Sequence, residues 1–304
     1  MVATRAVAPR NPYALPGVVR HYYDTHPWVD RYEVLARWIV DALPDHKGAG
    51  TLRLLDIGSG GGELALSLTT QLRRQRRPFK ATLVEPSRLM RSLRAHARVA
   101  ADPDVSVCAH SFPHDGCVSE ADRFDCVVAL LSLHHVPRWR IALGRLLQSS
   151  PHCELVVLGT VDGDAMTVGT GTSPRGASAD PQAEAFWREY HRLAAELSDE
   201  VSSRPSELSP WDYAPAVAWL ETRGFRQTAD TTLEQVRTLT YRQVLAWIRD
   251  GALTSLLAFG TRRIRDRLAD QMAAWLDAAG VAHDAAWAFR GRIKVIQMRR
   301  EASR

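Results

Sequence analysis

A strictly alternating run of glycines after an apolar strand constrains this chain more than any other feature. Residues 52–57 are largely apolar, which is typical of a buried parallel strand, and residues 63–68 have a helical pattern. Between them lie Gly58, Gly60 and Gly62. Glycine allows positive φ and lets a ligand lie against the backbone, while the helix N-terminus offers unpaired N–H groups. The stretch therefore predicts strand, tight turn and helix around a nucleotide-like ligand.

The spacing of the glycines narrows the kind of ligand. The dinucleotide fingerprint is G-x-G-x-x-G, whereas this chain has G-x-G-x-G with Asp56 two residues before the first glycine. The next strand, residues 79–84, ends at Glu85, near the roughly 20-residue offset at which a carboxylate accepts ribose hydroxyls. The two motifs together resemble those of the class I S-adenosylmethionine (SAM) dependent methyltransferases. The alternative is a structural glycine turn with Glu85 as a solvated surface acid.

The resemblance implies that SAM is the cofactor, with its adenosyl group across the glycine turn and its ribose on Glu85. The family has an acidic residue after the third strand, which here is replaced by Ser111, followed by Phe112. An N-terminal helical segment covers the cofactor in the family, often with a tyrosine, although Tyr22 and Tyr23 could also serve only in packing. The cofactor-binding residues expected in this way are Tyr22, Tyr23, Asp56, Gly58, Gly60, Gly62, Glu85, Pro86, Ser111, Phe112 and Leu130.

Strand and helix patterns alternate along the rest of the first half. Strands are expected at 105–109, 124–131 and 154–158, and helices at 87–101 and 138–148. Such alternation means parallel strands with right-handed crossovers and a ligand site at their carboxyl ends. We therefore expect an α/β fold, with a Rossmann-like seven-stranded mostly parallel sheet, helices on both faces, an N-terminal helical segment and inserted helices.

We expect one domain over residues 1–304. Residues 1–17 are a flexible terminus, 18–50 an N-terminal helical cap and 51–158 the SAM-binding core. Residues 159–223 hold a lid loop and substrate helices, because a Gly-, Thr- and Ser-rich stretch of that length is usually functional or disordered. Residues 224–304 contain the C-terminal strands, of which the last is antiparallel in the family, with inserted helices.

The segment after the fourth strand offers a candidate base. Residues 131–137 are similar to the S-L-H-H-x-P segment of small-molecule and sugar O-methyltransferases, in which the first histidine is a proposed general base paired with an aspartate after the fifth strand. The resemblance makes His134 the base and Asp162, two residues beyond the matching position Thr160, its partner. A histidine pKa near neutral suits this role. Alternatively, the two histidines only shape the pocket.

We expect the chain to transfer a methyl group from SAM to a small molecule. The expected acceptor is an oxygen atom of a specialised metabolite. A SAM-dependent lyase or cyclase and an N- or C-methyltransferase remain open, since fold does not fix chemistry. The chain lacks an Asn-Pro-Pro-Tyr segment, which disfavours methylation of nucleic acid or glutamine amino groups, and it has no separate basic module for RNA or protein.

We expect a cytoplasmic enzyme with a biosynthetic role. The net charge of +5 comes almost wholly from arginine, which we attribute to coding bias rather than to a polyanionic partner. No secretory signal or membrane span is expected. The four cysteines lack C-x-x-C spacing, so we expect them to be reduced core residues without a metal. Neither nucleic acid nor membrane is an expected partner, and a homodimer is left open.

Overall fold

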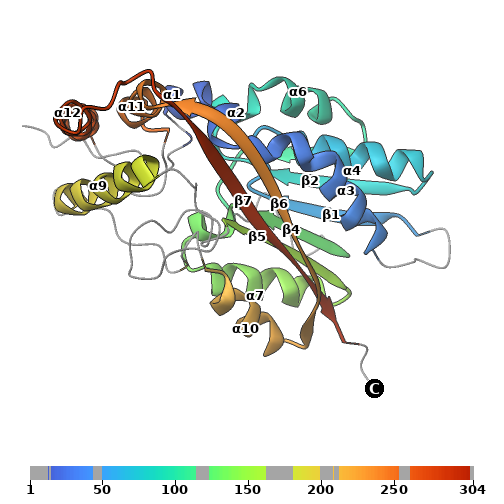
Figure 1. The fold of residues 1–304 in the computed structure, drawn as a ribbon. Coiled ribbons are helices and arrows are strands. Elements are labelled where there is room, and N and C mark those ends of the chain that lie inside the picture. Colours follow the sequence, from blue (N-terminus) through green and yellow to red (C-terminus); the bar gives the residue numbers. More distant parts are fainter. Residues whose placement is uncertain are drawn as a thin grey trace, which may run out of the picture. The chain divides into compact units, whose positions relative to one another are not determined.

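The computed structural model describes residues 13, 15–43, 50–113, 123–161, 181–198, 208, 212–252 and 261–301 (Figure 1). The chain divides into two compact units. The sheet unit comprises Trp28–Asp162, Ser206–Leu233 and Arg292–Arg304, and the helical unit comprises Met1–Pro27, Gly163–Pro205 and Glu234–Gly291. Two long strands, β6 (Phe225–Thr240) and β7 (Ala286–Arg300), belong in part to each unit.

The sheet has the strand order β3-β2-β1-β4-β5-β7-β6. Strands β1 to β5 pair in parallel, and β7 pairs antiparallel with β5, from Leu155 opposite Arg299 to Val161 opposite Ile293. The order reverses between β1 and β4, which is where open sheets of this class bind ligands. The strands are β1 (Leu52–Ile57), β2 (Phe79–Val84), β3 (Val105–Cys108), β4 (Cys126–Leu130), β5 (Leu155–Val161), β6 (Phe225–Thr240) and β7 (Ala286–Arg300).

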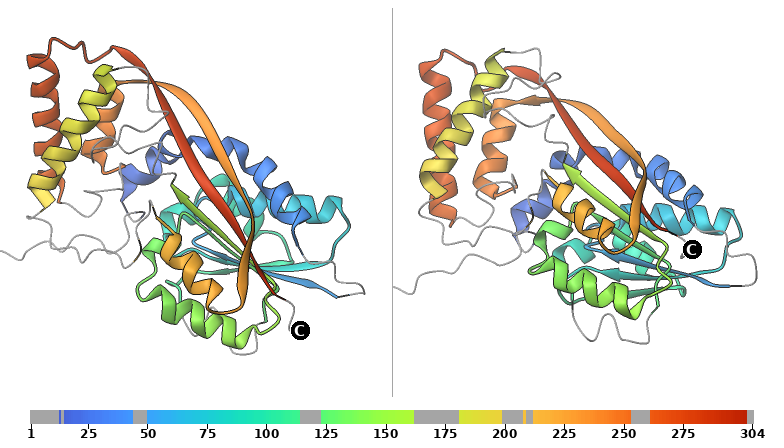
Figure 2. Two further views of the ribbon diagram at one scale, coloured as in Figure 1. Left: turned by 60° about the horizontal axis from the view of Figure 1, so that its bottom comes forward. Right: turned by 90° about the horizontal axis from the view of Figure 1, so that it is seen from below.

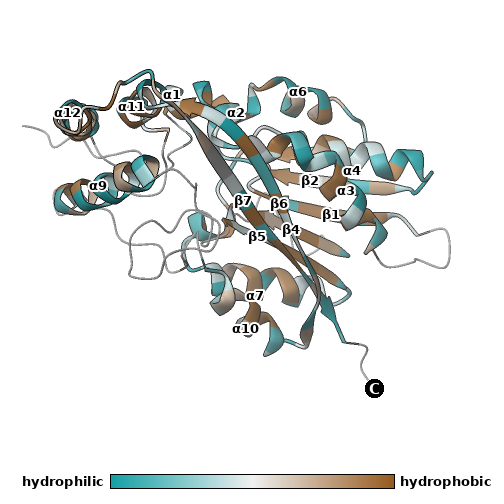
Figure 3. Cartoon of the chain, in the orientation of Figure 1, coloured by the Kyte–Doolittle hydropathy of each residue, from teal (hydrophilic) through white to brown (hydrophobic). Residues whose placement is uncertain are grey.

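Helices cover both faces of this sheet, as Figures 1 and 2 show. Successive side chains of a strand point to opposite faces, so Leu52 and Leu54 pack in one core cluster, and Leu55 and Ile57 in the other. The first cluster includes apolar residues of α3 (Tyr32–Asp41) and α4 (Glu63–Arg74), and the second those of α7 (Trp139–Ser149) and α10 (Ala214–Glu221). Figure 3 shows the inner strands as largely hydrophobic, as expected of strands buried on both faces. The expected mixed α/β, Rossmann-like fold is confirmed.

The helices of the sheet unit are α3 (Tyr32–Asp41), α4 (Glu63–Arg74), α5 (Arg88–Arg91), α6 (Arg94–Ala100), α7 (Trp139–Ser149) and α10 (Ala214–Glu221), with short 3-10 turns at Pro27–Arg31 and Leu133–His135. The prediction of a single helix over residues 87–101 is wrong, because two short helices, α5 and α6, occupy this stretch. Ser87 caps α5 by accepting a hydrogen bond from the Met90 N–H, but the helix ends before Leu93, whose backbone is extended. The Ser92 hydroxyl donates to the Leu89 carbonyl at 2.7 Å, a side-chain bond that competes with helix continuation.

The helical unit contains α1 (Pro16–Arg20), α2 (Tyr22–Thr25), α9 (Pro181–Ser198), α11 (Tyr241–Asp250) and α12 (Arg262–Ala278). Its core is one aromatic cluster that includes Phe186, Tyr190, Trp247 and Trp287. Helix α11 begins with a capping box between Thr240 and Gln243. The buried aromatic residues of α9 therefore serve packing. Most of the expected lid loop, and a part of the region in which inserted helices are expected, lie outside the described residues.

The cysteines depart from expectation at one position. Cys126 and Cys153 are free and buried, whereas Cys108 at the end of β3 is disulfide-bonded. The expectation that every cysteine is reduced is therefore wrong for Cys108. The spacing of cysteines along the chain could not reveal this, because a disulfide depends on which Cβ atoms the fold brings within about 4 Å.

Candidate functional site

The glycine turn adopts the backbone conformation that the sequence predicts. Gly58, Gly60 and Gly62 have φ values of +71°, +57° and +85°, in the left-handed region that side chains rarely enter. A Cβ on Gly58 would lie 2.4 Å from the Cβ of Ser132, and one on Gly62 would lie 2.5 Å from the Cα of His96. The first and third glycines are thus required both by their conformation and by close packing.

Glu85 is tied to this turn by its side chain. The Gly60 N–H donates to Oε2 at 2.9 Å, and the Ser87 N–H donates to Oε1 at 2.8 Å. Burial raises the pKa of Glu85 to about 7, although the two N–H groups and the nearby Arg91 favour the charged form. Each carboxylate oxygen can accept a second hydrogen bond, so the site retains acceptor capacity for a ligand's hydroxyls. Glu85 is not a solvated surface acid.

Asp56 provides a second buried carboxyl beside Glu85. It lies at the fifth position of β1, is 2% exposed and pairs in register with Leu83 of β2. Burial, followed by the charge of Glu85, raises the pKa of Asp56 to about 7. Two carboxyls that repel each other in a buried place are stabilised by a cationic or hydrogen-bond-donating ligand.

The end of β4 is joined to the end of β1. The Ser132 hydroxyl donates to the Ile57 carbonyl, and the Leu131 N–H donates to the Gly159 carbonyl of β5 at 2.9 Å. Leu131 has a positive φ of +55°, which turns the chain out of the strand. Leu130 packs so closely on β5 that a Cβ on Gly159 would meet its side chain. These contacts hold the histidine segment against the strand that leads into the glycine turn.

His134 lies in the 3-10 turn that follows. Its backbone N–H donates to the Tyr213 hydroxyl at 3.3 Å, and its Nδ1 lies 3.1 Å from the same oxygen. The His135 ring is 3.9 Å away, measured between centroids. Burial, with a smaller contribution from His135, places the pKa of His134 well below its ordinary value. The imidazole is therefore neutral near pH 7.

The last residue of β3 is hydrogen-bonded to Glu85. The Glu85 N–H donates to the Cys108 carbonyl at 3.0 Å. Phe112 is buried and belongs to the same core cluster as Ile57 and Val84, whereas Ser111 is exposed. Pro86 is partly buried and directly follows Glu85.

The structure therefore brings most of the predicted site residues to the carboxyl ends of neighbouring strands. Tyr22 and Tyr23 belong to the helical unit, where the Tyr22 ring lies 5.3 Å from that of Tyr23 and 4.6 Å from that of His26. Their contact with the cofactor stays a prediction. Asp162 lies outside the described residues, so its pairing with His134 stays a prediction too.

Sequence reasoning missed Tyr213 and Ser59. Tyr213 precedes α10, and the chain offered no signal for it, since its link to His134 spans 79 positions. Ser59 lies within the glycine turn itself, and its buried Oγ has no hydrogen-bond partner among the residues that the structure describes. A serine between two glycines could have been singled out as a polar group exposed to a ligand.

These features fit an adenosyl sulfonium cofactor. The buried Ser59 hydroxyl could bond to a polar atom of a ligand. The carboxyls of Asp56 and Glu85 can balance a positive charge and accept hydrogen bonds from ligand hydroxyls. The glycines carry no side chains that would keep the ligand from the backbone. Ligands of this kind bind at the reversal point of open sheets. Within the described ranges, no group of three acidic, histidine or cysteine side chains could hold a metal ion.

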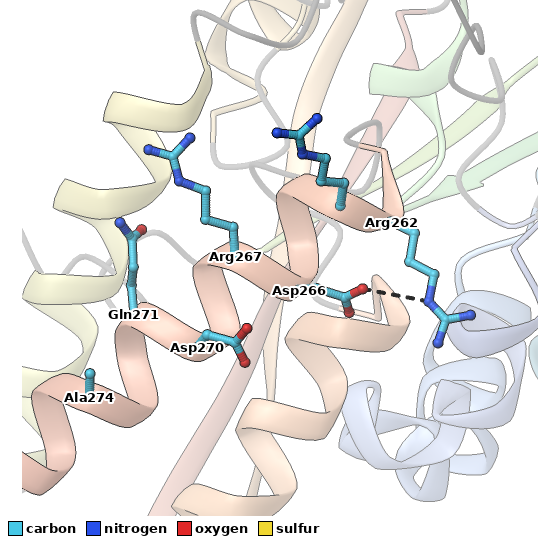
Figure 4. A pocket seen from close by; sticks show the side chains of 7 residues that line it. Arg262, Asp266, Arg267, Asp270, Gln271 and Ala274 are labelled. Carbon is cyan, nitrogen blue, oxygen red and sulfur yellow. Dashed lines mark ion pairs between the residues drawn. The ribbon is translucent and has the colours of Figure 1, made fainter.

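A separate hollow of about 710 Å³ lies along α12 in the helical unit (Figure 4). It is lined by Arg262, Arg263, Asp266, Arg267, Asp270, Gln271 and Ala274. Arg262 pairs with Asp266 at 3.6 Å, so part of its charge is compensated within the helix. Because one solvated helix face supplies every lining residue, this hollow is a weak candidate for chemistry. In the part of the chain that is described, no helix has the length and apolarity needed to cross a membrane.

Comparison with known proteins agrees with this geometry. Residues 28–211 match the model of a methyltransferase domain family. A proposed type II methyltransferase from Anaeromyxobacter dehalogenans has a similar structure, with 17% identity, a TM-score of 0.51 and coverage of 88% of this chain and 95% of that one. Magnesium protoporphyrin IX methyltransferase from Synechocystis, solved with bound SAH, has 10% identity, a TM-score of 0.45 and coverage of 90% and 83%.

The search of curated proteins found no match. At these identities the solved structures support the fold, while the family model spans more than half of the chain. The match includes the glycine turn, the buried acid after β2 and the five parallel strands, all of which lie within residues 28–211. The chain belongs to the methyltransferase domain family and is a class I SAM-dependent methyltransferase.

Proposed function

We propose that this enzyme transfers the methyl group of SAM to a hydroxyl oxygen of a small specialised metabolite, with His134 as the general base. The observation that carries the proposal is the hydrogen bond from the Ser132 hydroxyl to the Ile57 carbonyl. It fastens the segment containing His134 to the strand end from which the glycine turn departs. A proton acceptor held near a methyl donor is what hydroxyl methylation requires.

The residues of the sheet edge have distinct roles in this proposal. Glu85 accepts the ribose hydroxyls with the lone pairs that Gly60 and Ser87 leave free, and Asp56 opposes the positive charge of the cofactor. Gly58 to Gly62 allow the adenosyl group to lie against the backbone, with Pro86, Ser111, Phe112 and Leu130 around it. SAM, when bound, supplies a methyl group activated by its sulfonium charge.

The low pKa of His134 restricts the kind of hydroxyl group that it could deprotonate. A neutral imidazole can accept a proton near pH 7, but an imidazole with a lowered pKa is a weak base. Such a base serves an acidic hydroxyl, as in a phenol, better than an aliphatic alcohol. We therefore infer a phenolic or similarly acidic acceptor. A biosynthetic role and a cytoplasmic location belong to the proposal as expectations, and a homodimer stays open.

Product analysis tests the proposal. The protein is incubated with SAM alone and with a panel of phenols, alcohols and amines. S-adenosylhomocysteine that forms only with a phenol, together with a gain of one methylene mass in that phenol, supports it. Methylthioadenosine from SAM alone would instead indicate a lyase or cyclase, and methylated amines would contradict oxygen as the target.

The base assignment has its own test. With an accepted phenol, His134→Gln should lower kcat at least tenfold, since general bases contribute about 10²–10⁴-fold, while KM for SAM changes little. His152→Gln is the matched control, because this exposed histidine lies in the turn before β5. Unchanged turnover of His134→Gln across the pH range would remove the base role and leave methyl transfer intact.

A further inference from the structure

Two acidic side chains lie near the carboxyl ends of neighbouring parallel strands. Asp56 is the fifth residue of β1 and pairs in register with Leu83, and Glu85 directly follows β2. The exposed fractions of the two residues are 2% and 5%. Burial disfavours the charged form of a carboxyl, and a second carboxylate nearby disfavours it further. Full ionisation of this pair is therefore unfavourable in the ligand-free protein.

The hydrogen-bond donors are divided unequally between the two carboxyls. Glu85 accepts the Gly60 N–H on Oε2 at 2.9 Å and the Ser87 N–H on Oε1 at 2.8 Å. Among the residues that the structure describes, none donates a hydrogen bond to the Asp56 carboxyl. Because hydrogen bonds to a carboxylate favour its charged form, the fold supports one negative charge on Glu85 and lacks donors for a second on Asp56.

The charged and titratable groups around the pair do not compensate Asp56. Arg91 of α5 attracts the charge of Glu85, but its guanidinium donates to the Glu85 backbone carbonyl. His96 of α6, close to Arg91, has a pKa lowered by burial, and Cys126 of β4 has a pKa raised by burial. Both side chains are therefore neutral near pH 7. In the described part of the chain, Glu85 is the charged group that acts on Asp56.

We propose that Asp56 and Glu85 share one proton in the ligand-free protein near neutral pH, and that SAM binding releases this proton to the solvent. The carboxyl O–H bond breaks, the proton passes to buffer, and the positive charge of SAM then neutralises the ionised pair. A nearby cation favours the charged form of a carboxyl. The inference rests on the cofactor part of the proposed function, in which Asp56 opposes the charge of SAM, and it adds that SAM affinity depends on pH.

The pKa values of the pair set the pH range of this effect. Burial raises the pKa of each carboxyl to about 7, and for Asp56 the charge of Glu85 contributes as well. Such interacting groups titrate as a pair. Because SAM binds the ionised pair, raising the pH strengthens binding. The Kd should fall about tenfold per pH unit between about pH 6 and pH 7, where the α-amino group of SAM keeps its own charge.

Calorimetric titration of the full chain with SAM counts the released protons. The titration is run near pH 7 in PIPES and in imidazole, two buffers whose ionisation enthalpies differ. The apparent binding enthalpies should differ by the amount expected for about one proton released per SAM bound. Equal enthalpies in the two buffers, or a difference of opposite sign, would overturn the inference. A failure of the proposed function would appear separately, as an absence of methylated phenol.

Asp56→Asn tests which group is responsible. The variant should lose most of the proton release and bind SAM with a Kd that hardly changes with pH, since Glu85 keeps both N–H donors and no longer faces a second charge. Asp125→Asn is the matched control, because this carboxylate accepts the Arg53 N–H near the beginning of β1, and it should release the proton as the parent does. Undiminished release in folded Asp56→Asn would contradict the assignment. The measurement on the parent decides the matter if the variant does not fold.

Discussion

The two halves of the candidate site are built in different ways. On the cofactor side, the carboxylate of Glu85 meets the backbone of Gly60, 25 positions earlier, at the ends of two adjacent strands. On the acceptor side, His134 meets Tyr213, 79 positions later, the residue directly before α10. The first half depends on backbone geometry within one strand-turn-helix-strand unit, and the second on long-range side-chain packing. Substitutions should therefore act on stability and SAM binding in the first half, and on turnover in the second.

The largest effect expected in this comparison comes from Gly58→Ala. The new Cβ must adopt a left-handed φ and would lie 2.4 Å from the Ser132 Cβ, so the free energy of unfolding should fall by about 2–5 kcal/mol. Gly224→Ala is the control, because Gly224 also has a positive φ but nothing within 4 Å of its added Cβ. Gly224→Ala should lower the free energy of unfolding by only about 1–2 kcal/mol. Equal losses in urea unfolding would contradict the packing argument.

Glu85→Ala should have the next largest effect, on SAM affinity. Losing hydrogen bonds to a carboxylate costs about 1.5–3 kcal/mol, so Kd should rise about 10- to 100-fold by calorimetry. Asp125→Ala is the control, because the Asp125 carboxylate also accepts a backbone N–H, that of Arg53 at 2.8 Å, but at the beginning of β1. If both variants bind SAM as tightly as the parent, the cofactor site is misplaced.

The raised pKa of Asp56 predicts a pH-dependent stability. A carboxyl whose pKa is higher when folded binds more protons in the folded chain, so its ionisation destabilises the fold as pH rises from about 4 to about 7. Asp56→Asn removes this cost. The free energy of unfolding of the ligand-free variant should exceed that of the parent at pH 8 by at least about 1.4 kcal/mol, the equivalent of one pKa unit, and by less as pH falls toward 5. A pH-independent difference would show that Asp56 is not the group responsible.

The smallest effect concerns the link between the halves. Ser132→Ala removes the bond to the Ile57 carbonyl and should cost about 1 kcal/mol in unfolding free energy. Ser149→Ala, at the end of α7, removes a hydroxyl bond to the Leu146 carbonyl and should cost less, since water can replace that contact. If Ser132→Ala leaves both stability and turnover unchanged, the two halves are not joined through this serine.

The sequence alone predicted the strand, the glycine turn and the helix that follows it. It also predicted the functional importance of Glu85, the acidic residue directly after β2. These features are local: the alternating glycines dictate the backbone conformation, and apolar runs dictate buried parallel strands. Only the tertiary structure decided that α5 and α6 are separate helices, that Cys108 forms a disulfide and that Tyr213 contacts His134. Such contacts depend on side chains that the folded chain brings together from distant positions, and hydrophobic periodicity carries no information about them.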